Sequence, residues 1–234
     1  MDEHNFRQEV RTITADLQRL AAVGQTHARE VAVRMFSRMD ATTHPLEFGI
    51  ACRRGCSYCC HYHVYVTATE AFALAELVGK LEPSGKSQVE KQLEENFRAV
   101  SSMTVDQHIH TNVRCAFLSN AGECMAYEVR PSACRSHHAT DVNSCKVTFE
   151  DTRSPLQNAM KADLKMASTI FVLAQEMAHI EAGFDDKRYE LTAAVREARA
   201  NPASFKRYKA GKRAFPSVRD VTEPNARDSE KWRD

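Results

Sequence analysis

Cys52-Arg-Arg-Gly-Cys56-Ser-Tyr-Cys59-Cys60 places four thiols within nine residues, and no other stretch of the sequence constrains the structure as strongly. Gly55 can adopt a left-handed turn that folds the thiols toward one point. The two residues between Cys56 and Cys59 give the spacing at which both sulfurs of a tight turn reach one metal ion. Successive side chains diverge, so Cys60 either serves a second metal or stands free. The stretch therefore predicts a loop that wraps a metal ion.

The other four cysteines are spread more widely along the chain. They are Cys115, Cys124, Cys134 and Cys145. Their spacings of nine, ten and eleven residues are too loose to form a site alone, so we expect them to complete the first group. All eight cysteines are therefore candidate metal ligands. Eight thiols permit two four-cysteine sites, one polynuclear cluster, or one site with additional redox-active thiols.

Disulfide bonds and simple apolar packing account for the cysteines less well than metal binding does. Eight cysteines in 234 residues are too few for a small disulfide-stapled protein. Residues 1–10 contain neither an apolar segment nor a cleavage site of the kind a secretory signal has, so we expect a cytoplasmic protein in which thiols stay reduced. Buried free cysteines acting as small apolar side chains would not need four thiols in nine residues.

Composition excludes several classes of protein. Hydrophobic residues make up 43% and charged residues 27% of the chain, as in globular proteins. No apolar run approaches the roughly 18 residues of a membrane-spanning helix, so we expect no membrane partner. The 32 basic and 31 acidic side chains give a net charge of +1, which makes nucleic acid an improbable partner.

Apolar residues recur at spacings of three and four through most of the chain, which predicts helices. The predicted helices cover residues 4–40 with a break at Gly24, 67–79, 89–100, 156–181, 189–200, and a short segment from 202. Thr67 and Glu70 have the spacing of a capping box. Residues 64–66 are expected to be extended, residues 83–85 to form a turn, and Met160, Met166 and Met177 to lie in the core.

The sequence thus predicts a mostly α protein, an irregular helical domain organised around a cysteine-rich metal-binding centre. Residues 101–153 lack periodicity, which suits a segment shaped by its ligands. We divide the chain into an N-terminal helical segment (1–50), a cysteine-cluster metal-binding domain (51–150), C-terminal helices packing on it (151–214) and a flexible charged tail (215–234).

The cysteines occur within a longer ordered pattern. It consists of Cys52-x3-Cys56-x2-Cys59-Cys60, Thr67, Glu70, Cys115-Ala-Phe-Leu118, Cys124-x2-Tyr127 and Arg130-Pro131-x2-Cys134-Arg135. This pattern resembles the YkgJ-type cysteine-cluster family, a zinc- or iron-chelating domain, over roughly residues 52–145. The resemblance implies a metal-chelating or iron–sulfur domain with the eight cysteines as ligand candidates.

The residues around Cys134 are candidates for binding the cofactor, which we expect to be zinc or an iron–sulfur cluster. Pro131 restricts its own backbone and that of Arg130, so the segment is rigid. Arg130 and Arg135 can donate hydrogen bonds to thiolate or sulfide sulfur, and Tyr127 accompanies them. The roles of the nearby histidines are left open by the sequence; these are His61, His63, His137 and His138.

Two functions fit this pattern. In the first, the chain is a metal-binding protein whose thiolates hold zinc or iron for structure, storage, delivery or sensing. In the second, it is an iron–sulfur enzyme whose cluster has an open position that activates a small substrate in group transfer or redox chemistry. The expected partners are a metal ion and an unidentified small molecule or protein. The sequence names no substrate.

Overall fold

The fold is mostly helical, as predicted, in a computed structural model that describes residues 2–156 and 159–221. The long helices are α1 (Glu3–Val23), α2 (Ala28–Thr43), α3 (Ala68–Lys80), α4 (Pro83–Val100), α8 (Ala162–Ala182) and α9 (Leu191–Ala200). The short helices are α5 (Val105–Ile109), α6 (Ser132–Ser136), α7 (Val142–Glu150) and α10 (Ala203–Tyr208). The single-turn 3-10 helices are η1 (Gln25–His27), η2 (His44–Leu46), η3 (Tyr58–His61) and η4 (Tyr127–Val129).

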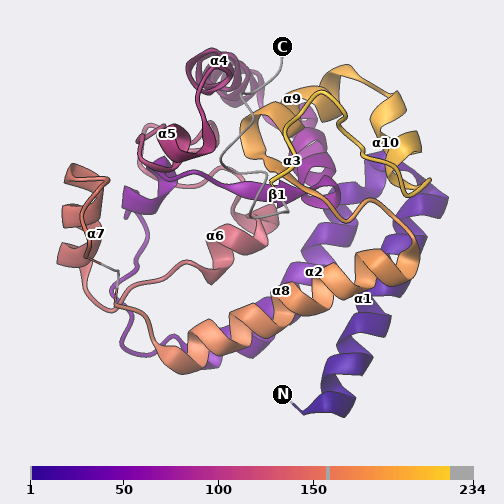
Figure 1. The fold of residues 1–234 in the computed structure, drawn as a ribbon, viewed down its shortest axis with the longest axis horizontal. Helices are drawn as coiled ribbons and strands as arrows, with labels where there is room; N and C mark the ends of the chain where they lie inside the picture. The colour runs from indigo at the N-terminus through magenta and orange to yellow at the C-terminus, as the bar shows by residue number, and fades with distance from the viewer. Residues whose placement is uncertain (1, 157–158, 222–234) are drawn as a thin grey trace.

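The first two helices follow the predicted pattern and its break. Gly24 has a φ of 101°, a left-handed backbone that favours glycine, and it ends α1. The apolar face of α1, which includes Ile13 and Leu17, is fully buried. Figure 1 shows α8 lying across α1 and α2, so these three helices, from the two ends of the sequence, together form one side of the molecule.

Helix α3 lies at the centre of the fold. Its capping box is present as predicted: the Thr67 hydroxyl accepts from the Glu70 backbone N–H, and the Glu70 carboxylate accepts from the Thr67 N–H. The ring of Phe72 packs edge-on against those of Phe205 and Tyr208 at centroid distances of 5.3 and 5.6 Å. Helix α3 is thereby fixed between α2 and the C-terminal helices.

A two-stranded antiparallel sheet joins the middle of the chain to its C-terminal part. Strand β1 (Tyr65–Thr67) pairs with β2 (Arg188–Glu190), with Val66 opposite Tyr189. The prediction of a helix over residues 189–200 was wrong at its start, because α9 begins only at Leu191. The Glu190 carboxylate caps α9 by accepting hydrogen bonds from Thr192 and Ala193 N–H at 2.9 and 2.7 Å.

Three other predicted features were wrong. Residues 83–85 are the first turn of α4, because Pro83 at the first helical position needs no N–H partner. Helix α8 begins at Ala162, and Leu156 lies outside it, 46% exposed. Met166 is 61% and Met177 43% exposed, because α1 and α6 cover the opposite face of α8. Gly183 ends α8 in a left-handed conformation.

The start of the expected flexible tail is packed against the core. Phe215, Val218 and Val221 are buried, and Asp220 forms a β-bridge with Tyr189. Apolar burial therefore orders residues 215–221, whereas residues 222–234 lie outside the described residues. Within residues 2–156 and 159–221, no helix is both long and apolar enough to cross a membrane.

Candidate metal centre

The thiols of the first cysteine group lie on a loop that ends in η3. Gly55 has a φ of 84°, so the left-handed turn predicted there is present. The Cys56 and Cys60 N–H groups donate to Arg53 and Ser57 carbonyls at 3.0 Å each, which closes two successive turns. Cys59 and Cys60 both lie in η3. The loop therefore holds Cys56, Cys59 and Cys60 in consecutive tight turns, which Cys52 precedes.

A hairpin brings Cys115 and Cys124 to this loop. The Cys115 N–H donates to the Cys60 carbonyl at 2.7 Å, and Cys124 forms a β-bridge with Leu118. At the hairpin tip, Gly122 has a φ of 76°, and a Cβ there would lie only 3.3 Å from the Gly55 carbonyl oxygen. Two backbone segments far apart in the sequence thus meet where a side chain would separate them.

Cys134 lies on α6, which is anchored from the centre of the fold. The N–H of Ser132 donates to Glu70 Oε1 at 2.8 Å, while Glu70 Oε2 accepts from the Thr67 N–H. One buried carboxylate therefore caps α3 and fixes the start of α6. The capping role of Glu70 is visible in the sequence, whereas its second contact joins residues 62 positions apart and has no sequence signal.

Cys145 lies on α7, which packs on η3 through aromatic and hydroxyl contacts. Phe149 of α7 meets the rings of Tyr58 and His61 edge-on at centroid distances of 5.5 and 5.0 Å. The Tyr62 hydroxyl lies 2.8 Å from Thr148 Oγ1. The η3 loop thus meets the segments that carry Cys115 and Cys145, while Cys134 is held on α6 from α3. All eight cysteines are free thiols.

Burial is the main cause of the raised pKa values of five of the thiols. It raises the pKa of Cys115 to about 12 and raises the pKa of Cys134 well above its usual value. The pKa of Cys59 is raised by a hydrogen bond with Cys60 and by burial. Burial also raises the pKa values of Cys52, Cys124 and Cys145. The thiolate forms thus need a compensating positive charge.

Arg130 supplies part of that charge. Its guanidinium lowers the pKa values of four thiols, those of Cys52, Cys59, Cys124 and Cys134. Its Nε is buried without a hydrogen-bond partner among the described residues, and its guanidinium lies 4.9 Å from the Tyr127 ring centroid. That Arg130 donates a hydrogen bond to a sulfur ligand stays a prediction.

Arg135 has a different position from the one expected. Its guanidinium donates to both Asp40 carboxylate oxygens, and to the carbonyls of Arg130, Tyr127 and Glu128. These bonds use all five of its N–H groups, and its side chain is only 4% exposed. Arg135 consequently fixes the backbone that carries Arg130 and has no N–H left for sulfur.

Tyr127 and Asp40 differ in how far the sequence anticipates them. The Tyr127 ring is 60% exposed and supports Arg130 from the solvent side. Asp40 lies on α2, which precedes the whole cysteine pattern. Its two carboxylate oxygens accept from Arg135 Nη1 at 2.6 and 2.5 Å. An exposed acidic position in a predicted helix gives no sign of such a contact, so the sequence does not reveal Asp40.

Two histidines lie between Cys134 and Cys145 in the sequence. His137 and His138 each have an Nε2 that is buried and lacks a hydrogen-bond partner among the described residues. Burial lowers the pKa of His137, which favours its neutral form. The ring of His137 packs edge-on against Tyr62 at 5.7 Å.

The described residues hold no group of three or more His, Cys, Asp or Glu side chains already positioned to hold a metal ion. By donor chemistry, eight free thiols and the unpartnered Nε of Arg130 fit a thiophilic ion, such as zinc or iron.

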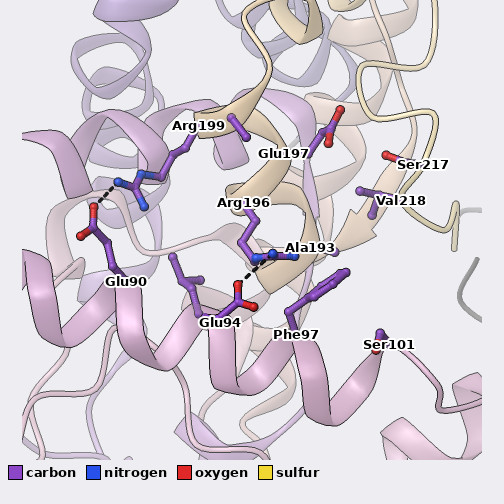
Figure 2. A pocket seen from close by; sticks show the side chains of 12 residues that line it. Glu90, Glu94, Phe97, Ser101, Ala193, Arg196, Glu197, Arg199, Ser217 and Val218 are labelled. Atoms are coloured by element: carbon purple, nitrogen blue, oxygen red, sulfur yellow. Dashed lines mark hydrogen bonds and ion pairs between the residues drawn. The ribbon is translucent and has the colours of Figure 1, made fainter. Parts of the chain in front are cut away.

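A separate groove lies between α4 and α9, away from the cysteines. Figure 2 shows Arg199 paired with Glu90, and Arg196 paired with Glu94 at 2.8 Å. The Arg196 guanidinium also lies 3.7 Å from the Phe97 ring centroid. The described residues that line this groove include no cysteine, and both arginines already have acidic partners.

Comparison with known proteins identifies the cysteine-bearing part of the chain. Residues 51–159 match the family model CxxCxxCC, whose description is "putative zinc- or iron-chelating domain". None of the curated proteins and none of the solved structures matches the chain. This match over residues 51–159, just under half of the chain, agrees with the family that the cysteine pattern resembles.

Proposed function

We propose that residues 51–159 bind zinc or iron through cysteine thiolates. The observation that carries this proposal is that eight free cysteines lie on the η3 loop, the hairpin, α6 and α7, with the buried, unpartnered Nε of Arg130 near several of them. A bound cation supplies the charge that buried thiolates need. Binding draws the sulfurs together and releases their protons. The absence of disulfides among the cysteines suits a reducing compartment, the cytoplasm.

The identity of the metal follows from the colour of the protein. An iron–sulfur cluster gives a brown, anaerobically purified protein with broad visible absorption, whereas zinc gives a colourless one. Either result, together with elemental analysis, supports thiolate chelation. A colourless protein in which elemental analysis finds neither zinc nor iron would overturn the proposal of thiolate chelation.

Replacement of Cys134 with Ser is expected to reduce the metal content at least about tenfold, because a neutral hydroxyl is a poor ligand for zinc or iron. Ser136→Ala is the matched control on α6, since the Ser136 hydroxyl bonds only the Ser132 carbonyl. Metal content per chain, measured by elemental analysis after desalting, checks the comparison. Full metal content in Cys134→Ser would exclude this thiol as a ligand.

Arg130→Ala is expected to retain metal but to weaken its binding by about 10- to 100-fold, the usual effect of losing a residue that supports a ligand. Arg130→Lys restores the charge without the planar fork, so its binding should be intermediate. Competition with a chromophoric chelator measures the affinities. Unchanged affinity and spectrum in Arg130→Ala would show that the guanidinium does not act on the thiolates.

A further inference from the structure

Helix α2 contacts the segment that carries Cys134, although α2 precedes the residues that the family model matches. Two side chains of α2 meet Arg135 on that segment. The Asp40 carboxylate accepts from Arg135 Nη1 through both of its oxygens, and the Phe36 ring centroid lies 4.6 Å from the Arg135 guanidinium. The matched residues begin only at position 51. The chain from η4 to α6 therefore rests on a helix that lies outside the match.

The Arg135 guanidinium holds the shape of this segment. Its other N–H groups donate to the carbonyls of Tyr127, Glu128 and Arg130 at 3.0, 2.8 and 2.8 Å. These carbonyls belong to η4 and to the residue that follows it. The chain between positions 127 and 135 thus closes around its own arginine, and Cys134 is the residue next to that arginine.

Asp40 supplies the negative charge that lets this arginine stay buried. The Arg135 side chain is only 4% exposed, and its ion pair in the described chain is with Asp40. Removal of one partner from a buried ion pair leaves an uncompensated charge, which is driven toward water. Arg135 reaches water only by releasing the three carbonyls that it binds. Loss of the Asp40 carboxylate should therefore loosen the segment and displace Arg130 and Cys134 together.

We propose that Asp40 is a positioning residue of the metal centre, which acts through Arg135 to hold Cys134 and Arg130 in place. This inference rests on the proposed function and deepens it, because it adds to the centre a residue outside the family match. Asp40 is not itself a ligand in this arrangement. Residues 51–159 alone then lack one of the supports of their own metal site.

The experiment compares Asp40→Ala with the wild-type full chain. Competition with a chromophoric chelator should show zinc binding weakened by about 10- to 100-fold, the usual effect of losing a residue that supports a ligand. The visible spectrum of the Co²⁺-loaded chain should shift, because the ligand geometry changes. Asp40→Glu retains the carboxylate and should restore most of both properties.

A second measurement needs no metal. In the reduced, metal-free chain, the rate at which Cys134 is alkylated reports how often its segment opens to solvent. Mass spectrometry of the digested chain should show this rate raised about tenfold in Asp40→Ala. Asp40→Asn retains one acceptor oxygen without the charge, so it serves if Asp40→Ala does not fold and should show the same changes to a smaller degree. Circular dichroism checks the fold of each variant.

Glu9→Ala is the matched control. Glu9 of α1 accepts from Arg38 Nε at 2.9 Å, so this variant also removes an ion pair of α2. Arg38 retains Asp16 at 3.0 Å, and the Glu9 carboxylate has no hydrogen bond or ion pair with the described segment from η4 to α6. Glu9→Ala should therefore match the wild type in zinc affinity, cobalt spectrum and alkylation of Cys134.

A double variant tests whether Asp40 acts through Arg135. Arg135→Ala and Asp40→Ala/Arg135→Ala should bind zinc with equal affinity, because the second substitution removes a carboxylate that no longer has its partner. Additive losses would overturn the inference, and so would zinc affinity, cobalt spectrum or Cys134 alkylation in folded Asp40→Ala equal to those of Glu9→Ala. A wild-type chain that binds neither Zn²⁺ nor Co²⁺ would instead overturn the proposed function itself.

Discussion

Removal of the bound metal is expected to lower the melting temperature of the chain by about 10 °C. A metal present at about 1,000 times its dissociation constant stabilises the folded state by about 4 kcal/mol, and each kcal/mol corresponds to about 2–4 °C in a chain of this size. Scanning calorimetry before and after chelation measures the change.

The loss of stability on metal removal is expected because the part of the chain between α4 and α8 has little helical stability of its own. The helices there, α5, α6 and α7, contain only five, five and nine residues, too few to be stable alone. Contacts with η3 and the thiol ligands must therefore hold this region together. Limited proteolysis should show new cleavage in residues 101–153 after chelation, and added zinc or iron should reverse it. An unchanged melting temperature after verified metal removal would contradict this coupling.

Replacement of Glu70 with Ala is expected to lower the free energy of unfolding by about 4 kcal/mol. The substitution leaves the N–H groups of Thr67 and Ser132 without their acceptor, and Glu70 is only 1% exposed. Each unsatisfied buried N–H costs about 1–3 kcal/mol, and the capping box is lost as well. Urea denaturation measures the change.

Two variants separate this effect from a general loss of charge. Glu70→Gln retains one acceptor oxygen and should lose about half as much stability. Glu95→Ala removes an exposed carboxylate from α4, where it pairs only with Lys91 at 3.8 Å, and should change stability by less than about 0.5 kcal/mol. Equal stability of Glu70→Ala and Glu95→Ala would show that the carboxylate does not anchor α6.

The sequence predicted what depends on local spacing. The helix break at Gly24, the capping box of α3 and the left-handed turn at Gly55 are each encoded within a few residues, and all are present. Strand β2 was missed because three residues are too short for a periodic pattern, and its partner lies more than 120 positions away. The start of α8 was misplaced because apolar spacing continues before Ala162 without a capping signal.

Around the cysteines, the sequence identified the donor atoms but not their supports. Arg130 and Arg135 look equivalent in the sequence, since each lies near Cys134. They differ because the Arg135 guanidinium donates to Asp40, 95 positions away, whereas the buried Nε of Arg130 has no hydrogen-bond partner among the described residues. Contacts over such separations follow from the packing of α2 and the loop after η4, and no periodicity records them.

The most direct test of the account is the zinc and iron content of the full chain, measured by elemental analysis immediately after anaerobic purification. The account predicts at least about one equivalent of zinc plus iron per chain, retained through desalting. A content well below one equivalent, with all eight cysteines freely alkylated in the folded protein, would contradict it.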